Sequence, residues 1–424
     1  MSGRAATIEE LGIEHIPEDR RHGSAGRVFT LWFAANLTIA DYVIGVLCVL
    51  AFGLTVSQSI PVLILGNALG GLTLGLSAAM GPRLGFPQML SSRSSFGRRG
   101  NYPLGGLNWI STVGWFTVNT ILGGEAVLAI WPSFNFYAAM VLLVALQVII
   151  AVYGHDFIHL FEKIMSLVLG VLFLGVLLLG LARLDAALSF VPANGSAATA
   201  SFGSIGVVLA VSFSYIMAWS PYASDSSFAL ELAGALVGSL TQSFDYFQAL
   251  KTFSGAFGVP AVVAIILGAM AANALNIYTN SLSALVLDVK AKRWVTVIAG
   301  SLVGLALSII GGANFESFYE NFLLILDYWI TPWLGIVLVD YYVLRRTTVE
   351  SSAQAPAWNF PALGIYGLAI LLSVPFMVPP TSIGSPVGLL SGWFGGADFS
   401  YYISFALAAV FYYLFRKSRH RFRP

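Results

Sequence analysis

Polar side chains interrupt three apolar stretches of the chain: LWFAANLTIAD, SYIMAWSPYASD and GAMAANALNIYTNS. The polar residues concerned are Asn36, Thr38, Asp41, Ser220, Ser224, Asp225, Asn273, Asn276, Thr279 and Asn280. Their amide, hydroxyl and carboxylate groups can hydrogen-bond a small molecule or coordinate a cation. Because such groups are costly in lipid, they are typical of a substrate or ion pathway.

We expect the helix to be broken in each of these stretches. Pro221 removes a backbone donor and clashes with the preceding turn, and non-helical backbone at membrane depth is tolerated only where it lines protein or a cavity. The stretches around Asn36 and Pro221 lie in the first and sixth predicted spans, as in the first helices of two inverted five-helix repeats. Paired broken helices of this kind mark the midplane site of a secondary transporter. A kinked helix with satisfied polar groups remains the alternative for each break taken singly.

Carboxylates within predicted spans are candidates for carrying a coupling ion. They are Asp41, Glu125, Asp225, Glu231, Asp327 and Asp340. We expect Asp225 and Asp340 to lie near cytoplasmic ends, and Asp41 is the first candidate for a titrating group. Its alternative role is to cap the broken first span.

Other chemistry finds little support in the sequence. The single cysteine, Cys48, excludes a disulfide framework, and His155 and His159 have helical metal-ligand spacing without a third ligand in reach. No phosphate-binding loop motif occurs, so transport would draw on an ion gradient. Without a nucleophile–base pair or a metal-ligand set at membrane depth, we expect no enzyme and no cofactor.

The composition defines the elements that must hold these groups. Of 424 residues, 57% are hydrophobic and only 10% are charged, against roughly 25% charged in an average soluble domain. The net charge of +1 gives no reason to expect a nucleic-acid partner. The sequence therefore predicts an all-helical polytopic membrane protein in contact with lipid.

Twelve apolar stretches are long enough to cross a bilayer core of about 30 Å. They are residues 28–54, 59–81, 104–130, 135–153, 160–182, 203–224, 226–243, 257–287, 294–312, 317–343, 360–379 and 400–415. With the N-terminus inside, every Lys and Arg except Arg183 and Lys251 falls on the cytoplasmic side, as the positive-inside tendency requires. We expect twelve crossings of the cell membrane, with both termini cytoplasmic.

This topology divides the chain into five parts. They are a cytoplasmic segment 1–27, a first five-helix repeat 28–182, a second repeat 203–346, two additional spans within 360–415, and a basic tail 416–424. The seventh span is short and contains Glu231, and almost no loop separates it from the sixth. Oligomeric state stays open.

Several longer motifs resemble the nucleobase:cation symporter-1 family, most closely its purine-cytosine permease branch. They are IEHIPEDRRHG, LWFAANLTIAD, GPRLGFPQMLSSRSSFGRRGNYP, VGWFTVNTI, AWSPYASD, ANALNIYTNSLSAL and ENFLLILDYWITPWLGIVLVDYY. The resemblance runs from about Glu14 to Arg346 and is weaker in the last two spans. It implies a LeuT-type fold of five plus five inverted repeats with two extra helices, and cation-driven uptake of a flat heterocycle.

Matching the motifs residue by residue implies a substrate site. Trp115 and Trp219 would hold the ring between their faces, since stacking contributes about 1–3 kcal/mol per base. Asn119 and Asn273 would read the donor and acceptor edge, with Asn276 supporting them. Tyr215 and Ser220 complete the predicted substrate set. The other tryptophans considered are interpreted as structural: Trp109, Trp131, Trp329, Trp333 and Trp393.

The family's cation site lies between the first-span break and the eighth span, which implies Asn36, Thr38, Asp41, Gly268 and Ala271 here. The stretch 268–272, GAMAA, carries no hydroxyl or carboxylate. This favours H⁺ over Na⁺ as the coupling ion.

One departure from the family follows Asp225, where the usual continuation is absent and the chain passes directly to SSFALELAGALVGS. Two alternatives to a nucleobase importer therefore stay open. One is a symporter of the same fold for allantoin, hydantoin, uracil or a vitamin-like compound. The other is a transport-impaired scaffold or receptor, if the shortened junction of spans six and seven is real.

Overall fold

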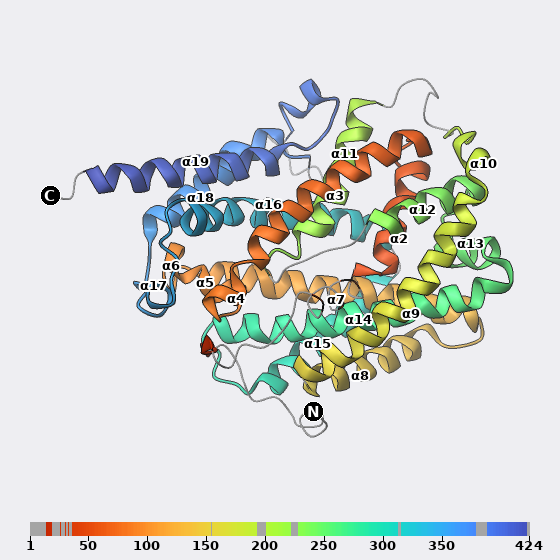
Figure 1. Cartoon of the computed structure of the whole chain (residues 1–424), viewed down its shortest axis with the longest axis horizontal. Coiled ribbons are helices and arrows are strands. Elements are labelled where there is room, and N and C mark those ends of the chain that lie inside the picture. The colour runs from red at the N-terminus through yellow and green to blue at the C-terminus, as the bar shows by residue number, and fades with distance from the viewer. Residues whose placement is uncertain are drawn as a thin grey trace.

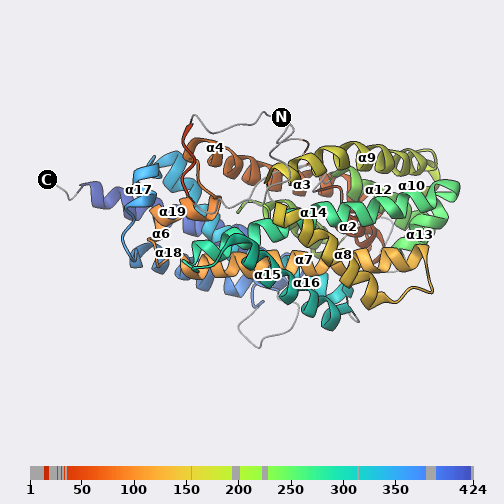
Figure 2. The ribbon, with the colours of Figure 1, turned by 90° about the horizontal axis from the view of Figure 1, so that it is seen from below.

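The computed structural model describes residues 14–18, 26, 30, 33, 36–153, 155–192, 201–221, 228–312, 315–378 and 388–421. Helices dominate these ranges, and each predicted span overlaps one of them (Figures 1 and 2). The helices of the first half are α2 (Ile39–Leu50), α3 (Val56–Ala78), α7 (Tyr102–Ile130), α8 (Phe136–Tyr153) and α9 (His155–Leu181). Three short helices join α3 to α7: α4 (Gly81–Leu84), α5 (Gln88–Ser91) and α6 (Arg93–Phe96).

The second half repeats this succession of helices. Its members are α11 (Phe202–Met217), α12 (Phe228–Thr241), α14 (Gly258–Val286), α15 (Arg293–Gly311) and α16 (Phe315–Leu338). Shorter helices α10 (Leu184–Leu188), α13 (Tyr246–Phe253) and α17 (Val349–Ala353) lie between spans, and α18 (Phe360–Ser373) and α19 (Ser400–Arg421) complete the chain. Six helices in the described ranges are long and apolar enough to cross a membrane, and four shorter helices are also apolar. The count of twelve crossings stays a prediction.

The two halves exchange helices in a reciprocal way. The first helix of each half packs on the second helix of the other, α2 against α12 and α11 against α3. The third helices, α7 and α14, pack on each other at the centre (Figure 1). This reciprocity is the arrangement that an inverted repeat requires.

Paired glycines allow both reciprocal contacts. On α3, a Cβ added to Gly66 would lie 2.8 Å from Ser212 of α11, and one added to Gly70 would lie 2.8 Å from Ile216. On α12, a Cβ at Gly234 would lie 2.0 Å from the carbonyl oxygen of Tyr42. Both helices thus use glycines four residues apart, since Gly238 also meets α2, and small residues at this spacing let membrane helices approach closely.

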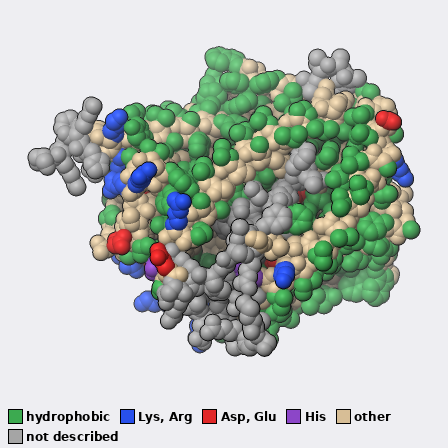
Figure 3. Space-filling view, viewed as in Figure 1, with side chains coloured by type: hydrophobic (Ala, Val, Ile, Leu, Met, Phe, Trp, Pro, Cys, Tyr) green, Lys and Arg blue, Asp and Glu red, His purple; other side chains and the backbone are tan. Residues whose placement is uncertain are grey.

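Apolar side chains cover most of the visible surface, as expected of a protein bathed in lipid, and the visible Lys and Arg lie mainly toward the end that carries α17 and the C-terminus (Figure 3). The two cations predicted to lie on the opposite side, Arg183 and Lys251, belong to the α10–α13 end. The Arg183 guanidinium lies 4.9 Å from the Phe253 ring centroid, and Lys251 Nζ donates to the Ala129 carbonyl at 2.8 Å.

Candidate functional site

The helix of the first span is interrupted, as the sequence predicts, and the helix of the sixth ends before the predicted end of that span. Leu37 and Thr38 are not helical, and Thr38 has an extended backbone (φ −114°, ψ 161°) before α2 begins at Ile39. The sixth span ends as α11 at Met217, and residues 218–221 form a turn in which Ser220 N donates to the Met217 carbonyl at 2.8 Å. The expected break in the eighth span is wrong, because α14 is continuous from Gly258 to Val286 and its Asn side chains face neighbouring helices.

Direct hydrogen bonds hold the two interrupted spans together. The Thr38 hydroxyl and the Tyr215 hydroxyl lie 2.9 Å apart, and either can be the donor. From α16, the Tyr319 hydroxyl donates to the carbonyl of Ala40, the second residue of α2, at 3.2 Å. The break in the first half is therefore fixed by side chains from α11 and α16.

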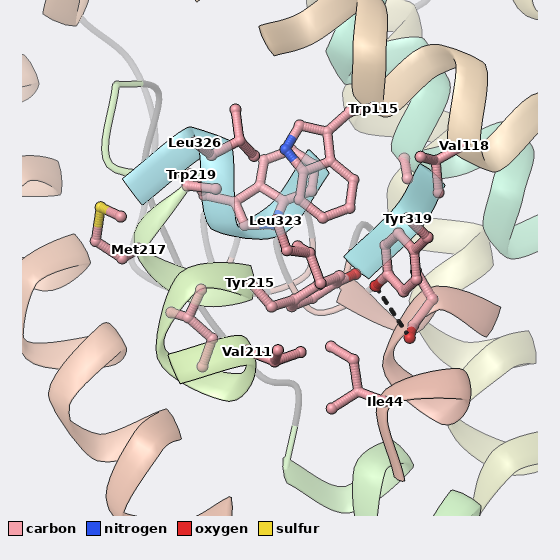
Figure 4. Close-up of a cluster of buried hydrophobic side chains, with 14 of the residues drawn as sticks. Ile44, Trp115, Val118, Val211, Tyr215, Met217, Trp219, Tyr319, Leu323 and Leu326 are labelled. Atoms are coloured by element: carbon pink, nitrogen blue, oxygen red, sulfur yellow. Dashed lines mark hydrogen bonds between the residues drawn. The ribbon is translucent and has the colours of Figure 1, made fainter. Parts of the chain in front are cut away.

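An aromatic cluster occupies the junction (Figure 4). The rings of Trp115 and Trp219 are nearly parallel, with an interplanar angle of 17° and centroids 6.3 Å apart. Tyr215, Tyr319 and Phe322 meet Trp115 edge-on, with centroids 5.3, 6.2 and 5.3 Å from its own. We call these five side chains the aromatic cluster.

The spacing of the two indoles bears on how they could hold a planar ring. Stacked bases lie about 3.4 Å apart in DNA, so a ring between two indoles needs a separation of about 7 Å. The Trp115 and Trp219 centroids are closer than this, so the two indoles must move apart to admit a ring between them. In this conformation the cluster is closed on itself.

Several buried polar atoms near these residues have no hydrogen-bond partner in the described part of the chain. They are Trp115 Nε1, Asn119 Oδ1, Ser220 Oγ and Asn276 Oδ1. The Asn119 amide nitrogen donates only to the Trp115 carbonyl one turn earlier on α7, at 3.1 Å. Since buried polar groups are normally hydrogen-bonded, these atoms supply donors and acceptors for a polar ligand.

Asn273 is used differently. Its amide nitrogen lies 3.1 Å from the Phe116 carbonyl, 3.2 Å from Thr120 Oγ1 and 3.2 Å from Gln147 Oε1. Its own oxygen accepts from the Asn276 amide at 3.2 Å. Asn273 thus joins α14 to α7 and α8, which favours interhelical hydrogen bonding over contact with a ligand.

The residues predicted to form a cation site lie where α14 meets the first break. A Cβ on Gly268 would lie 2.5 Å from the Leu37 carbonyl oxygen, so the two backbones are in direct contact. Ala271, Asn36, Thr38 and Asp41 are all buried. Asp41 lies in the first turn of α2, where the helix dipole favours a negative charge.

The remaining carboxylates differ in their surroundings. Asp225 lies outside the described residues, and Glu125 is half-buried near the end of α7. Glu231 accepts a hydrogen bond from the Asn67 amide of α3. Asp340 accepts from four hydroxyl groups, whereas neither oxygen of Asp327 has a partner among the placed residues. No group of three possible metal ligands occurs in the described ranges.

Sequence reasoning missed four residues of interest. Phe322 belongs to ENFLLILDYW and Tyr319 directly precedes this stretch, and their spacing of three residues on one helix face was the available signal. Phe322 packs against bare backbone, because a Cβ on Gly114 would lie 2.2 Å from its Cε2. Glu162 and Asp398 are also buried carboxylates, and Asp398 lies in a loop where no apolar window marks it.

Two broken helices joined at an aromatic cluster, within two reciprocally packed five-helix units, define a secondary transporter of the LeuT-type fold. Two solved structures of the nucleobase-cation-symport-1 family transporter Mhp1 share this fold. The closed form with bromovinylhydantoin bound gives a TM-score of 0.76 at 17% identity, covering 99% of this chain and 97% of that one. The inward-facing form gives 0.71 at 18% identity, covering 98% and 96%.

Residues 15–404 match the family described as permeases for cytosine/purines, uracil, thiamine and allantoin, and the chain belongs to this family. A putative purine-cytosine permease of Bacillus subtilis, YxlA, is 30% identical, over 97% of this chain and 96% of its own length. The purine-cytosine permease FCY2 of Saccharomyces cerevisiae is 25% identical, over 96% of this chain and 85% of its own length. The alignment with YxlA spans 458 positions, more than the chain's 424 residues, so the chain lacks some segments that its relative has.

Proposed function

We propose that the protein imports cytosine or a purine base by alternating access, driven by a cation gradient across the cell membrane. The observation that carries this proposal is the near-parallel pair of Trp115 and Trp219 at the junction of the two broken helices. A base is flat and uncharged, and it would be held between the indole faces after the two rings move apart.

The polar edge of the base would be read by the buried atoms that lack a protein partner. Asn119 Oδ1 and Asn276 Oδ1 accept hydrogen bonds, Trp115 Nε1 donates, and Ser220 Oγ can do either. Asn273 would position Asn276 through their 3.2 Å bond instead of touching the base. An analogue lacking one edge group would leave a buried atom unpaired, at a cost of about 1–3 kcal/mol.

We propose H⁺ as the coupling ion. A Na⁺ site between the first break and α14 would need oxygen ligands, and the stretch 268–272 supplies no side-chain oxygen. The close approach of the Gly268 backbone to the Leu37 carbonyl leaves little room for a side-chain ligand at this position. Asp41, buried in the first turn of α2, is the candidate titrating group at this site.

The proposed orientation has both termini in the cytoplasm and twelve crossings, with repeats over 28–182 and 203–346. The location of Arg183 and Lys251 at the α10–α13 end supports it. Because the only cysteine, Cys48, is buried, cysteines introduced at Lys251 and Arg345 would report sidedness cleanly. An impermeant maleimide added to intact cells should label the first variant and spare the second; the reverse result would overturn the orientation.

Two alternatives remain for the cargo and for transport itself. The family description also names uracil, thiamine and allantoin, so another heterocycle could be the substrate. The shortened junction before α12 favours a scaffold or receptor that binds a base without moving it.

Uptake into proteoliposomes separates these readings. Radiolabelled cytosine and adenine should accumulate when the outside is made acidic, and Na⁺ should be dispensable at constant pH. Competition by unlabelled allantoin, hydantoin, uracil or pyridoxine but not by adenine would reassign the cargo. Base binding without accumulation under any imposed gradient would favour the receptor, and strict Na⁺ dependence would overturn proton coupling.

A further inference from the structure

A second carboxylate, outside the aromatic cluster, lies in surroundings that favour its uncharged form. Asp327 lies on α16, its side chain is fully buried, and neither of its oxygens has a hydrogen-bond partner in the described part of the chain. An ionised carboxylate in an apolar interior is strongly disfavoured unless it is paired or hydrogen-bonded. A bound proton removes this cost.

The polar groups around Asp327 are hydroxyls, and some of them have no hydrogen-bond partner among the placed residues. Ser214 of α11 is a near neighbour, but its single hydroxyl hydrogen goes to the Leu323 carbonyl at 2.8 Å. From α19, the hydroxyls of Tyr401 and Tyr402 are also buried and have no partner among the placed residues. Phe213 ties these rings to α11, with centroids 6.1 and 5.3 Å from its own.

No Lys, Arg or His among the described residues is found to offset a negative charge at Asp327. Among described residues, the titratable groups that interact with Asp327 are Tyr328 on α16, Asp398 in the loop before α19, and Tyr401 and Tyr402 on α19. The other helices packed against α16 add little: α3 has no titratable residue, and α18 has only Tyr366, which donates to the Trp329 carbonyl at 3.2 Å. On α11 the one such residue is Tyr215, bonded to Thr38, and on α7 they are Tyr102 and Glu125 near its ends.

Asp327 is linked to the aromatic cluster through α16, the helix that carries Asp327 and part of the cluster. Its helix carries Tyr319 and Phe322, which contact Trp115, and Tyr319 also holds the first break through Ala40. The Ser214–Leu323 bond joins α16 to α11 one turn before the second break. A charge on Asp327 would require water or hydroxyl donors to reach it, and so would loosen the contact of α16 with α11 and α19.

We propose that Asp327 is a proton-binding site, separate from the substrate site, whose protonation holds α16 closed over the aromatic cluster. The inference rests on the proposed function, since the proton it takes up would be one that drives transport. Protonated from the outside, Asp327 stabilises the closed state; releasing the proton to the inside requires α16 to move away. A group that binds H⁺ more tightly in one state must bias the equilibrium between the states.

Other buried carboxylates serve this role less well. Glu231 already accepts a hydrogen bond from Asn67. Glu162 is as buried and as free of partners as Asp327 in the described ranges, but its helix, α9, packs on α8, α12 and α14 and carries none of the aromatic cluster. Glu162→Gln is therefore the matched control for Asp327→Asn.

The test compares exchange with accumulation in proteoliposomes containing the full chain. Asp327→Asn should keep exchange of labelled cytosine or adenine against internal unlabelled base, and should lose acid-driven accumulation at least tenfold. Glu162→Gln should resemble the wild type in both assays. Asp327→Asn with wild-type acid-driven accumulation would overturn the inference, as would an equal loss in Glu162→Gln.

A readout without substrate keeps the test independent of the cargo and of transport. The infrared carbonyl band of a protonated carboxylic acid should be present in the wild type at neutral pH and should be reduced in Asp327→Asn. A wild type that binds no base but shows a band that Asp327→Asn reduces would overturn the proposed function and leave the proton site standing. A band unchanged by Asp327→Asn would overturn the proton site, whatever the uptake assays give.

Discussion

Two kinds of buried carboxylate occur in this protein, and they differ in what surrounds them. Asp340, in the π-helical turn Val339–Val343 after α16, accepts hydrogen bonds from Ser94, Ser95, Thr347 and Tyr412, at 3.3, 3.1, 3.1 and 2.7 Å. Asp327, thirteen residues earlier in the chain, is equally buried and accepts none in the described part of the structure. Within the described residues, Asp340 is thus surrounded by hydrogen-bond donors, whereas Asp327 accepts no hydrogen bond.

The difference separates structural charges from functional ones. The hydroxyl groups that donate to Asp340 satisfy its oxygens, and they join α6, α19 and the segment after α16 at one end of the molecule. Asp398 is similar, since it accepts from Tyr328, from the backbone of Val378 and from Ser400. Asp327 and Glu162 have no such shell, so we expect them to be neutral and able to exchange a proton. Substituting the amide for each acid should expose the contrast.

The largest effect should follow Asp340→Asn. The amide keeps the volume but turns an NH₂ group toward hydroxyl donors, leaving buried groups unsatisfied at about 1–3 kcal/mol each. We expect a loss of about 3 kcal/mol in the free energy of unfolding, measured by denaturation in detergent micelles. A loss below about 0.5 kcal/mol would remove the distinction between the two kinds of carboxylate.

Asp398→Asn should be the next most damaging. Its two oxygens accept from Ser400 at the start of α19, from Tyr328 on α16 and from the Val378 N–H, and the amide replaces one acceptor by a donor. We expect about 2 kcal/mol of destabilisation in the same assay. Protection of the α19 amides in hydrogen exchange should fall with it; unchanged protection would show that this shell is dispensable.

Asp288 gives an intermediate case outside the spans. Burial alone would raise its pKa, but hydrogen bonds from Tyr102 and Arg98 and the charges of Arg93 and Arg98 outweigh burial and lower the pKa. Because Asn tolerates the positive φ of 59° at this position, Asp288→Asn removes the charge without straining the backbone.

The effect of Asp288→Asn should depend on pH. A depressed pKa in the folded state gives stability that is present above the ordinary value of about 4 and is lost as the pH falls through the lowered value. The melting temperature of the variant should therefore lie below that of the wild type at pH 7, and the gap should narrow toward pH 3. A gap that is constant with pH would exclude the ion pair as its cause.

The smallest effect should be that of Glu162→Gln. Because a protonated Glu and a Gln have the same shape and charge, we expect the free energy of unfolding at pH 7 to change by less than about 0.5 kcal/mol. Destabilisation as large as that of Asp340→Asn would mean that Glu162 is ionised and paired, which would contradict the contrast drawn above.

Much of this fold can be predicted from the sequence, and physical reasons explain why the rest cannot. Apolar length marks every span, and Pro221 and the polar run Asn36–Thr38 mark the two breaks. The side on which a polar residue of a buried helix faces is not encoded locally. Asn273 therefore suggested base recognition, while its contacts with Phe116, Thr120 and Gln147 depend on helices far away in the chain.

The paired glycines of α3 and α12 are a second case in which the local sequence does not reveal a contact between helices. Gly66, Gly70, Gly234 and Gly238 are ordinary in a chain with 43 glycines, and only the packing of α3 on α11 and of α12 on α2 gives them meaning. Likewise, the closeness of Trp115 and Trp219 follows from the motifs, but their direct stacking in this conformation does not.

The most direct test of the account is equilibrium binding of radiolabelled cytosine and adenine to the purified protein. The variants are Trp115→Ala and Trp219→Ala, with Trp393→Ala as the control, because Trp393 is 81% exposed and does not belong to the aromatic cluster. We predict that each cluster variant weakens binding about ten- to a hundredfold, in line with the worth of stacking per base, and that the control binds as the wild type does. Wild-type affinity in both cluster variants would contradict the claim that a base is held between these two rings.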